Sequence, residues 1–207
     1  MTYVITVSSV NPRGGFIKAG NAEWMKHVVS LDFDISDVIQ GKENRLLSLD
    51  DVPEYFVLKR ARTDLPDMFW GSAQLIIVSE RYRDIIEDLD PGVHQMWPME
   101  IRRRRAGPVP GKWFGLNVRA RAKTIVKERS SVQVSRGGTQ VFGIVTRSMT
   151  FIDHMKFNLA VDETIEVGHN LWWDNTLDEA ALFCSDAFHD AVVEAGLKSI
   201  PFKKCVS

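Results

Sequence analysis

The sequence has few cysteines and no long apolar run. Its 207 residues include only Cys184 and Cys205, which are too few for a disulfide framework and fit a reducing compartment. No stretch approaches the ~20 apolar residues that a membrane-spanning helix needs. The N-terminal MTYVITVSSV has no basic leader before an apolar core. We therefore expect a cytoplasmic protein with no signal peptide and no membrane partner.

The sequence also lacks the spacings that mark metal and phosphate sites. The five histidines are scattered, and none belongs to an HExxH or CxxC…H ligand set. Gly137 and Gly138 are not followed by the Lys-Ser/Thr of a phosphate-binding loop. Asp32, Asp34 and Asp37 resemble part of a calcium loop, but that loop needs glycine where Asp37 stands, so surface polarity is the favoured explanation. We expect no metal and no cofactor.

A cysteine and a histidine near the C-terminal end come closest to a catalytic pair. Cys184 lies in an apolar run, and His189 follows five residues later on a predicted helix. A Cys–His nucleophile requires the two side chains to meet. A thiol at a strand end and a histidine on the solvent side of a helix are not expected to do so. We expect no catalytic residues, and hence a protein that is not an enzyme.

The net charge of −1 conceals one strongly basic segment. Arg102 to Arg129 holds ten basic residues and one acid, a charge of +9, whereas the remainder holds 16 basic and 26 acidic residues, a charge of −10. Such a stripe can steer an anionic partner, or it can fold against the acidic remainder and be neutralised there. A nucleic-acid-binding module would use the stripe on phosphates, with Trp113 and Phe114 for stacking, and is the alternative function. No known recognition motif accompanies the stripe, so we expect no nucleic-acid partner.

Two segments of the chain repeat one pattern. Leu75–Ile86 and Ala181–Val192 each contain an apolar run, a serine, an acid, an aromatic residue three positions after the serine and an aspartate five positions after it. Each predicts a strand that leads directly into an amphipathic helix capped by Ser79 or Ser185. Gly196 is expected just past the second helix. Duplication and two independent solutions to one packing problem both explain the repeat.

The remaining pattern predicts a mixed, strand-rich α+β fold in a single domain over residues 1–207. A short helix is expected over Asn21–Val29. A hairpin of Val132–Ser135 and Thr139–Val145 is expected around Arg136-Gly137-Gly138. Other strands are expected over Thr2–Ser8, Leu31–Ile35, Tyr55–Lys59, Ala73–Val78, Val93–Arg102, Trp113–Thr124 and Ile200–Cys205, and strands or extended segments over Met149–Leu159 and Thr164–Trp173.

Motifs in both halves of the chain resemble an immunity-protein family of bacterial polymorphic toxin systems, first catalogued as a domain of unknown function. The block LIIVSERYRDIIEDLDPGVHQMWPMEI, preceded by Tyr55–Lys59 and Leu65-Pro66-Asp67, is similar to the family's central pattern. Asn170–Trp173, Ser185-Asp186 and Gly196-Leu197 leading into Ile200-Pro201-Phe202 resemble its closing pattern. The resemblance covers roughly residues 55–205.

The resemblance implies a protein that binds and neutralises a cognate toxin and has no cofactor or catalytic residues. For the partner-binding surface we predict Arg102, Arg103, Arg104, Arg105 and Trp113 as a charged patch. We also predict Trp172 as an exposed aromatic anchor, because a large rigid ring buries much area at low entropic cost. The alternative is that Trp172 and Trp173 both pack under loops. Self-association of the chain stays open.

Overall fold

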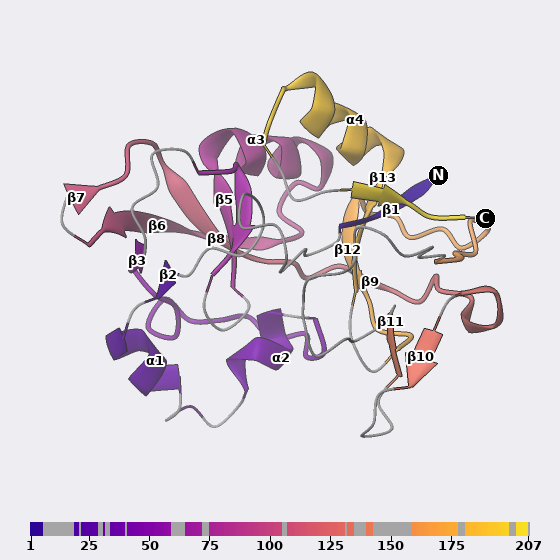
Figure 1. Ribbon diagram of the computed structural model, residues 1–207, viewed down its shortest axis with the longest axis horizontal. Helices are drawn as coiled ribbons and strands as arrows, with labels where there is room; N and C mark the ends of the chain where they lie inside the picture. The colour runs from indigo at the N-terminus through magenta and orange to yellow at the C-terminus, as the bar shows by residue number, and fades with distance from the viewer. Residues whose placement is uncertain are drawn as a thin grey trace.

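Two β-sheets stand next to each other and carry helices on their faces (Figure 1). The computed structural model describes residues 1–5, 19–20, 22–28, 31, 34–39, 41–58, 65–71, 75–104, 107–130, 132–134, 140–142, 159–177, 181–198 and 202–206. The predicted strand-rich α+β fold is confirmed. In the part of the chain described, no helix is both long enough and apolar enough to cross a membrane.

The first sheet has seven strands and is centred on one long strand. Its strands are β2 (Ala19–Gly20), β3 (Tyr55–Leu58), β4 (Met68–Trp70), β5 (Ile76–Ser79), β6 (Gln95–Arg103), β7 (Gly107–Pro108) and β8 (Trp113–Asn117). They follow the order β2-β3-β6-β8-β5-β4, with β7 paired to β6. The first half of β6 pairs with β8, and its second half pairs with β3 and β7. The strand β6 therefore links the middle of this sheet to the β7 end of the molecule.

The second sheet has five strands and joins both ends of the described chain. Its order is β14 (Phe202–Lys204), β1 (Thr2–Ile5), β13 (Ala181–Ser185), β12 (Leu171–Asp174) and β9 (Arg121–Ala122), with β9 parallel to β12. The strands of the predicted hairpin pair with each other in a separate two-stranded sheet, as β10 (Val132–Val134) and β11 (Gln140–Phe142). The predicted turn at Arg136-Gly137-Gly138 lies outside the described residues. A 3₁₀ turn, η2, covers Lys127–Arg129.

The helices divide between two sides of the molecule. Helices α3 (Glu80–Leu89) and α4 (Asp186–Glu194) lie beside each other above the sheets (Figure 1). Helices α1 (Ala22–Val28) and α2 (Ile35–Ile39) lie on the opposite side of the seven-stranded sheet. Side chains of both sheets and of α3 and α4 share a central core, while separate cores cover the outer face of each sheet.

Three predicted segments differ in the structure. Of Thr164–Trp173, only the last three residues are in a strand, as part of β12. Apart from Leu159, the predicted segment Met149–Leu159 lies outside the described residues. The residues of Leu31–Ile35 that the structure describes do not form an edge strand, because Asp34 begins helix α2: its carboxylate accepts from Ser36 N at 2.8 Å. Ile35, Val38 and Ile39 are buried at helical spacing. The predicted strand Trp113–Thr124 is two strands, since the chain leaves the first sheet after β8 and enters the second at β9.

The two strand–helix units form as predicted, and both serines cap their helices. The Ser79 hydroxyl accepts from Tyr82 N at 3.3 Å and donates to the Asp67 carboxylate at 2.7 Å. The Ser185 hydroxyl accepts from Phe188 N at 3.2 Å and donates to the Asn170 side-chain carbonyl at 2.7 Å. The predicted glycine after the second helix, Gly196, has a φ of 62°, which explains its place there.

Each cap should contribute measurably to stability. Ser79→Ala and Ser185→Ala are each expected to lower the free energy of unfolding by about 1–2 kcal/mol, because each removes a helix cap and a second hydrogen bond. Chemical denaturation measures the change. The matched control is Ser36→Ala inside α2, where alanine is the better helix former and little change is expected. Losses no larger than that of the control would contradict the role given to the caps.

The repeat extends well beyond the capped helices. The hairpin β4–β5 precedes α3 as β12–β13 precedes α4, and β6 follows α3 as β14 follows α4. The antiparallel order β4-β5-β8-β6 therefore matches β12-β13-β1-β14. In the second half, the N-terminal strand β1 takes the place that β8 has in the first.

Equivalent side chains confirm this correspondence. The rings of Tyr82 and Phe188, each three residues after a capping serine, meet edge to face at 5.8 Å. Four residues after each serine, Arg83 lies over the Phe114 ring of β8 and His189 stacks on the Tyr3 ring of β1. So many matched contacts favour duplication over two independent packing solutions.

Candidate partner-binding site

The basic segment Arg102–Arg129 does not form one surface. Four of its described cations lie around the β6–β7–β8 region, and three lie beyond β9 in the other half of the molecule. These are Arg102, Arg103, Arg104 and Lys112 at the first end and Lys123, Lys127 and Arg129 at the second. A continuous stripe, on which the nucleic-acid alternative depends, is therefore absent from the described residues.

Arg121, between the two ends, has a structural role. The Arg121 guanidinium donates to the carbonyls of Val118, Ala120 and Glu43 at 2.7, 3.0 and 3.2 Å. Burial, together with the neighbouring charge of Arg119, lowers the pKa of Arg121 to about 10. Arg121 therefore connects the segment between β8 and β9 to the loop after α2. Its guanidinium is not available to a partner.

Arg102 is held at the surface by two neighbours. Its Nε lies 2.8 Å from the Glu100 carboxylate, and its guanidinium lies 3.9 Å from the centre of the Tyr55 ring. The hydrogen bond to Glu100 raises the pKa of Arg102. Arg103 is half-buried and Arg104 is exposed, while Arg105 lies outside the described residues. The predicted charged patch is thus partly neutralised by the Glu100 carboxylate of the same strand.

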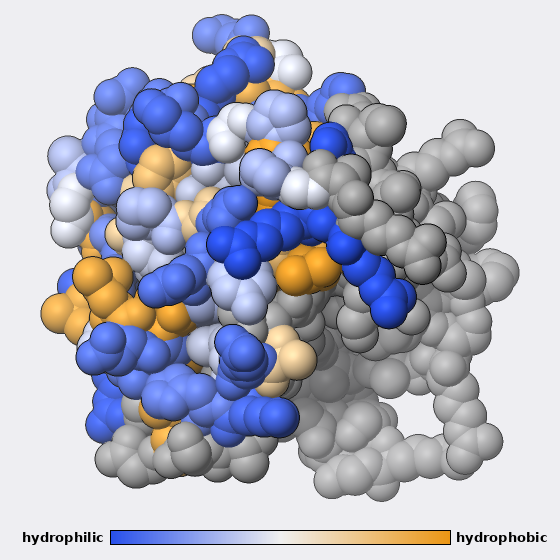
Figure 2. Space-filling view, turned by 90° about the vertical axis from the view of Figure 1, so that its left-hand side faces the viewer, coloured by the Kyte–Doolittle hydropathy of each residue, from blue (hydrophilic) through white to orange (hydrophobic). Residues whose placement is uncertain are grey.

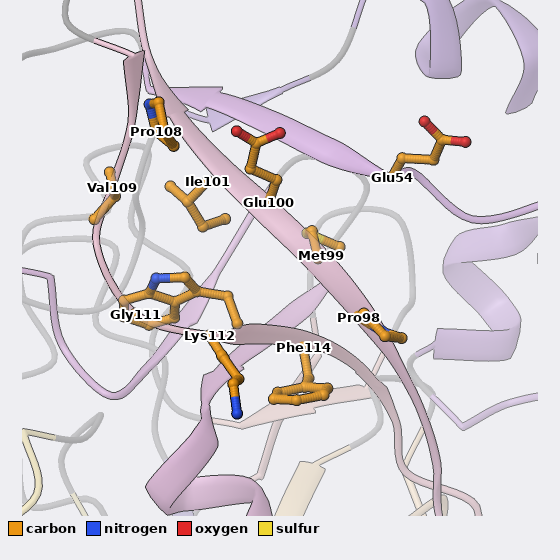
Figure 3. A pocket seen from close by; sticks show the side chains of 11 residues that line it. Glu54, Pro98, Met99, Glu100, Ile101, Pro108, Val109, Gly111, Lys112 and Phe114 are labelled. Atoms are coloured by element: carbon orange, nitrogen blue, oxygen red, sulfur yellow. The ribbon is translucent and has the colours of Figure 1, made fainter.

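A groove lies beside these arginines, between β6 and the connection from β7 to β8 (Figure 3). Its volume is about 470 Å³. The connection moves away from β6 after Val109, whose N–H still donates to the Ile101 carbonyl at 2.6 Å, and returns at Trp113, which pairs with Met99. Most residues that line it are apolar: Pro98, Met99, Ile101, Pro108, Val109, Trp113 and Phe114. The charged residues among its lining are Glu54, Glu100 and Lys112.

Trp113 lines the groove and belongs to the core of the first sheet. It is 8% exposed and packs edge to face on Phe69, with ring centres 5.7 Å apart. Its indole Nε1 is buried and has no hydrogen-bond acceptor. Other buried indole nitrogens also lack acceptors, those of Trp70, Trp97, Trp172 and Trp173, but none of these rings lines the groove.

The N-terminus of α3 contacts Lys112, one of the residues that line the groove. Lys112 Nζ lies 2.7 Å from the Glu80 carboxylate, and Glu80 N donates to the Lys112 carbonyl at 3.0 Å. Arg83, one turn further along α3, lies 4.5 Å above the centre of the Phe114 ring. Glu80 and Glu100 are therefore already paired with cations of the protein. On the face at this β7 end of the molecule, hydrophilic side chains surround smaller apolar areas (Figure 2).

Trp172 is not the exposed anchor that we predict from sequence. It is 2% exposed and stacks on Phe183 in the core on the outer face of the second sheet. That face is covered in turn by Ile125, Leu159 and Val161. Trp173 lies in the central core, so both rings are buried. Trp172 is therefore left out of the surface proposed below.

The candidate catalytic and metal-binding residues take ordinary positions. Cys184 is fully buried, and burial raises the pKa of its thiol well above the usual range, so it stays protonated at neutral pH. His189 stacks on Tyr3 with ring centres 4.0 Å apart. Asp34 caps α2, Asp37 pairs with Lys42, and Asp32 lies outside the described residues. No cluster of metal-ligating side chains occurs within the described ranges.

Comparison with known proteins decides the family. The sequence model of the Imm11 immunity protein family matches residues 18–207. The chain belongs to this family. No curated protein shows significant similarity to it. Membership in Imm11 indicates a toxin-neutralising role and implies an inhibitor rather than an enzyme. The resemblance noted from sequence motifs is confirmed, and it extends further toward the N-terminus than those motifs.

Proposed function

We propose that this Imm11 protein acts in the cytoplasm by binding a cognate toxin and covering its active site or substrate channel. The observation that carries the proposal is the family match over residues 18–207. Steric inhibition needs a stable fold that presents a fixed surface, and three cores provide such a scaffold. We place the contact surface at the β7 end, where Arg102, Arg103, Arg104 and Trp113 gather with Lys112 around the groove.

A binding experiment tests this proposal. The purified chain is mixed with the C-terminal domain of the toxin encoded immediately upstream of its gene, and complex formation is measured by calorimetry. An equimolar complex that suppresses the toxin's activity supports the proposal. A chain that fails to bind this domain, or that binds and leaves its activity intact, would refute it.

Electrostatic steering should be visible in the association rate. Arg104 is exposed and makes no ion pair with a described residue, so its charge is available to an anionic partner. Raising the ionic strength from about 0.05 M to about 0.5 M is expected to lower the association rate roughly tenfold. Arg104→Glu is expected to lower it about three- to tenfold at low salt.

Lys123→Glu is the control for this prediction. It makes the same change of charge at an exposed site beyond β9, in the other half of the molecule. Its effect on the association rate should be clearly smaller than that of Arg104→Glu. Stopped-flow fluorescence measures all three rates. A rate that does not depend on salt, or equal losses in the two variants, would exclude a steering role for the β7 end.

A further inference from the structure

We infer that the loop from α2 to β3, residues 41–54, is a further part of the toxin-binding surface and contacts a basic face of the toxin that contains an apolar depression (Figure 1). Leu46 and Leu49 would enter that depression, and the carboxylates beside them would face its cations. The inference rests on the proposed function and extends it, because it names a second contact element and the chemistry of the toxin face that fits it.

The first argument is the exposure of two leucines in this loop. Leu46 and Leu49 are 61% and 73% exposed, and apart from Met1 they are the most exposed large apolar residues in the described part of the chain. One exposed leucine is common, whereas two within four positions form an apolar area that favours a partner. The fold does not require either of them, since Leu47 between them is 3% exposed and anchors the loop in the core.

The second argument is that side chains of the protein body hold the loop backbone in place. Every second carbonyl from residue 41 to residue 47 accepts a hydrogen bond. The donors are Asn175 to Gly41, Arg121 to Glu43 at 3.2 Å, Asn117 to Arg45 at 3.1 Å and Gln95 to Leu47 at 2.6 Å. The Gln95 side chain also accepts from Leu47 N at 3.0 Å. The loop is therefore fixed to elements of both sheets.

A turn fixes the end of the loop that carries Leu49. The Asp51 carboxylate accepts from Ser48 N at 3.1 Å and from the Ser48 hydroxyl at 2.8 Å, and the Asp51 carbonyl accepts from Trp24 Nε1 at 2.8 Å. A surface that already has its bound shape loses little conformational entropy on binding. The fixed backbone therefore favours Leu46 and Leu49 as binding anchors.

The third argument is charge, which indicates the partner that fits. Residues 34–54 contain six acidic and two basic residues, a net charge of −4. Lys42 is paired with Asp37 of α2 at 2.8 Å. The exposed carboxylates of Glu43 and Asp50, on either side of the leucines in the sequence, make no ion pair with a described residue. Basic side chains around an apolar depression would complement this loop, whereas a nucleic acid would be repelled by it.

The loop is continuous with the surface proposed at the β7 end. Glu54, its last residue, lines the groove, and the Glu54 carbonyl accepts from Glu100 N at 2.8 Å. The contact surface then has a basic region at Arg102–Arg104 and an acidic region along the loop. Two regions of opposite charge specify one orientation of the toxin, because the reversed orientation would bring like charges together.

Hydrogen exchange measured by mass spectrometry locates the contact. In the complex with the upstream-encoded toxin domain, the amides of residues 43–50 are expected to exchange at least about threefold more slowly than in the free chain. Helix α4, on the other side of the molecule from α2, is the internal control and should exchange at an unchanged rate (Figure 1). A complex in which exchange across the loop does not change would overturn the inference.

An affinity measurement tests the leucines. The double variant Leu46→Ser, Leu49→Ser is expected to weaken toxin binding at least about tenfold, because it removes the apolar anchors. The matched control is Val193→Ser on α4, where the valine is 57% exposed, and its affinity should change less than about twofold. All three positions are exposed, so the thermal unfolding midpoints should stay close to that of the wild type, which verifies folding.

The association rate tests the charge of the toxin face. Asp50→Lys is expected to lower the rate about three- to tenfold at low salt, because it reverses a charge that faces toxin cations. Glu194→Lys makes the same change at an exposed position of α4 and should have a clearly smaller effect. A rate that rises in Asp50→Lys would show that the facing toxin surface is acidic, and the inference would be wrong.

The outcomes separate this inference from the proposed function. If the wild-type chain does not bind the toxin domain, the proposed function itself fails. If the wild-type chain binds and inhibits, but the leucine variant and Val193→Ser behave alike, only the assignment of the loop fails. Concentration-dependent self-association that the leucine variant abolishes would assign the leucines to a second copy of the chain and would also overturn the inference.

Discussion

Asp174→Ala is expected to lower the free energy of unfolding by about 3–5 kcal/mol. Asp174 is fully buried at the end of β12, and one carboxylate oxygen accepts from Thr124 N, Thr124 Oγ1 (2.9 Å) and Ile125 N (3.1 Å). The other oxygen accepts from Thr176 N at 2.8 Å. Alanine would leave all of these donors buried without an acceptor, and an unpaired buried donor is costly.

Two variants complete this test, which uses equilibrium chemical denaturation. Asp174→Asn keeps one acceptor oxygen and should lose about half as much stability. Asp162→Ala removes a similar turn on the surface, where Asp162 accepts from Thr164 N at 2.9 Å and Thr164 Oγ1 at 2.6 Å. Water can replace those bonds, so the denaturation midpoint should hardly change. Equal losses at Asp162 and Asp174 would show that burial is not the cause.

The second large effect is expected at the contact between the two halves. Trp70 and Trp173 occupy equivalent positions in the repeat, are 4% and 2% exposed, and meet edge to face with ring centres 6.0 Å apart. Replacing either by alanine should lower the free energy of unfolding by about 3–5 kcal/mol. At Trp173 the fit is especially close, because Gly41, with a φ of 78°, lies against the ring where a Cβ would clash.

A double-mutant cycle shows whether this pair couples the halves. With leucine in place of each tryptophan, Trp70 and Trp173 should show a coupling energy of about 1 kcal/mol. The control pair is Phe69 and Trp172, the preceding residues of the same two strands, which lie in separate cores. Their effects should add. Additive effects in both pairs would mean that the halves do not depend on each other through these rings.

The repeat was the most informative part of the sequence because its signals are local. A serine followed by an acid and then by apolar residues at helical spacing specifies a capped helix within a few residues. Ser79 and Ser185 could therefore be assigned from the sequence. The full extent of the duplication could not, because β1 joins the second half from the opposite end of the chain and β4 is only three residues long.

The errors arose where tertiary structure overrides a local pattern. The strand pattern from Trp113 to Thr124 continues unbroken, with Val118 and Ala120 both buried, while the chain passes from one sheet to the other. Alternation also suggested an outward-facing Trp172, although the second sheet is covered on both faces. Near α2, the helical spacing of Ile35, Val38 and Ile39 after Asp34 was the signal that could have corrected the strand.

The candidate site was only partly predictable. The sequence shows the basic residues and Trp113, but it does not show that Glu100 and Glu80 neutralise Arg102 and Lys112. The groove depends on pairing between Ile101 and Val109 and on the departure of the connection from β6. Sequence-based reasoning therefore located the segment and missed its shape.

The central claim is that this chain protects cells by binding a toxin and performs no chemistry of its own. Growth of bacteria that express the upstream-encoded toxin domain, with and without this chain at matched expression, measures that claim most directly. The account predicts growth arrest without the chain and restored growth with it, with the two proteins recovered as a stable complex. Growth arrest that persists in the presence of abundant, folded chain would contradict it.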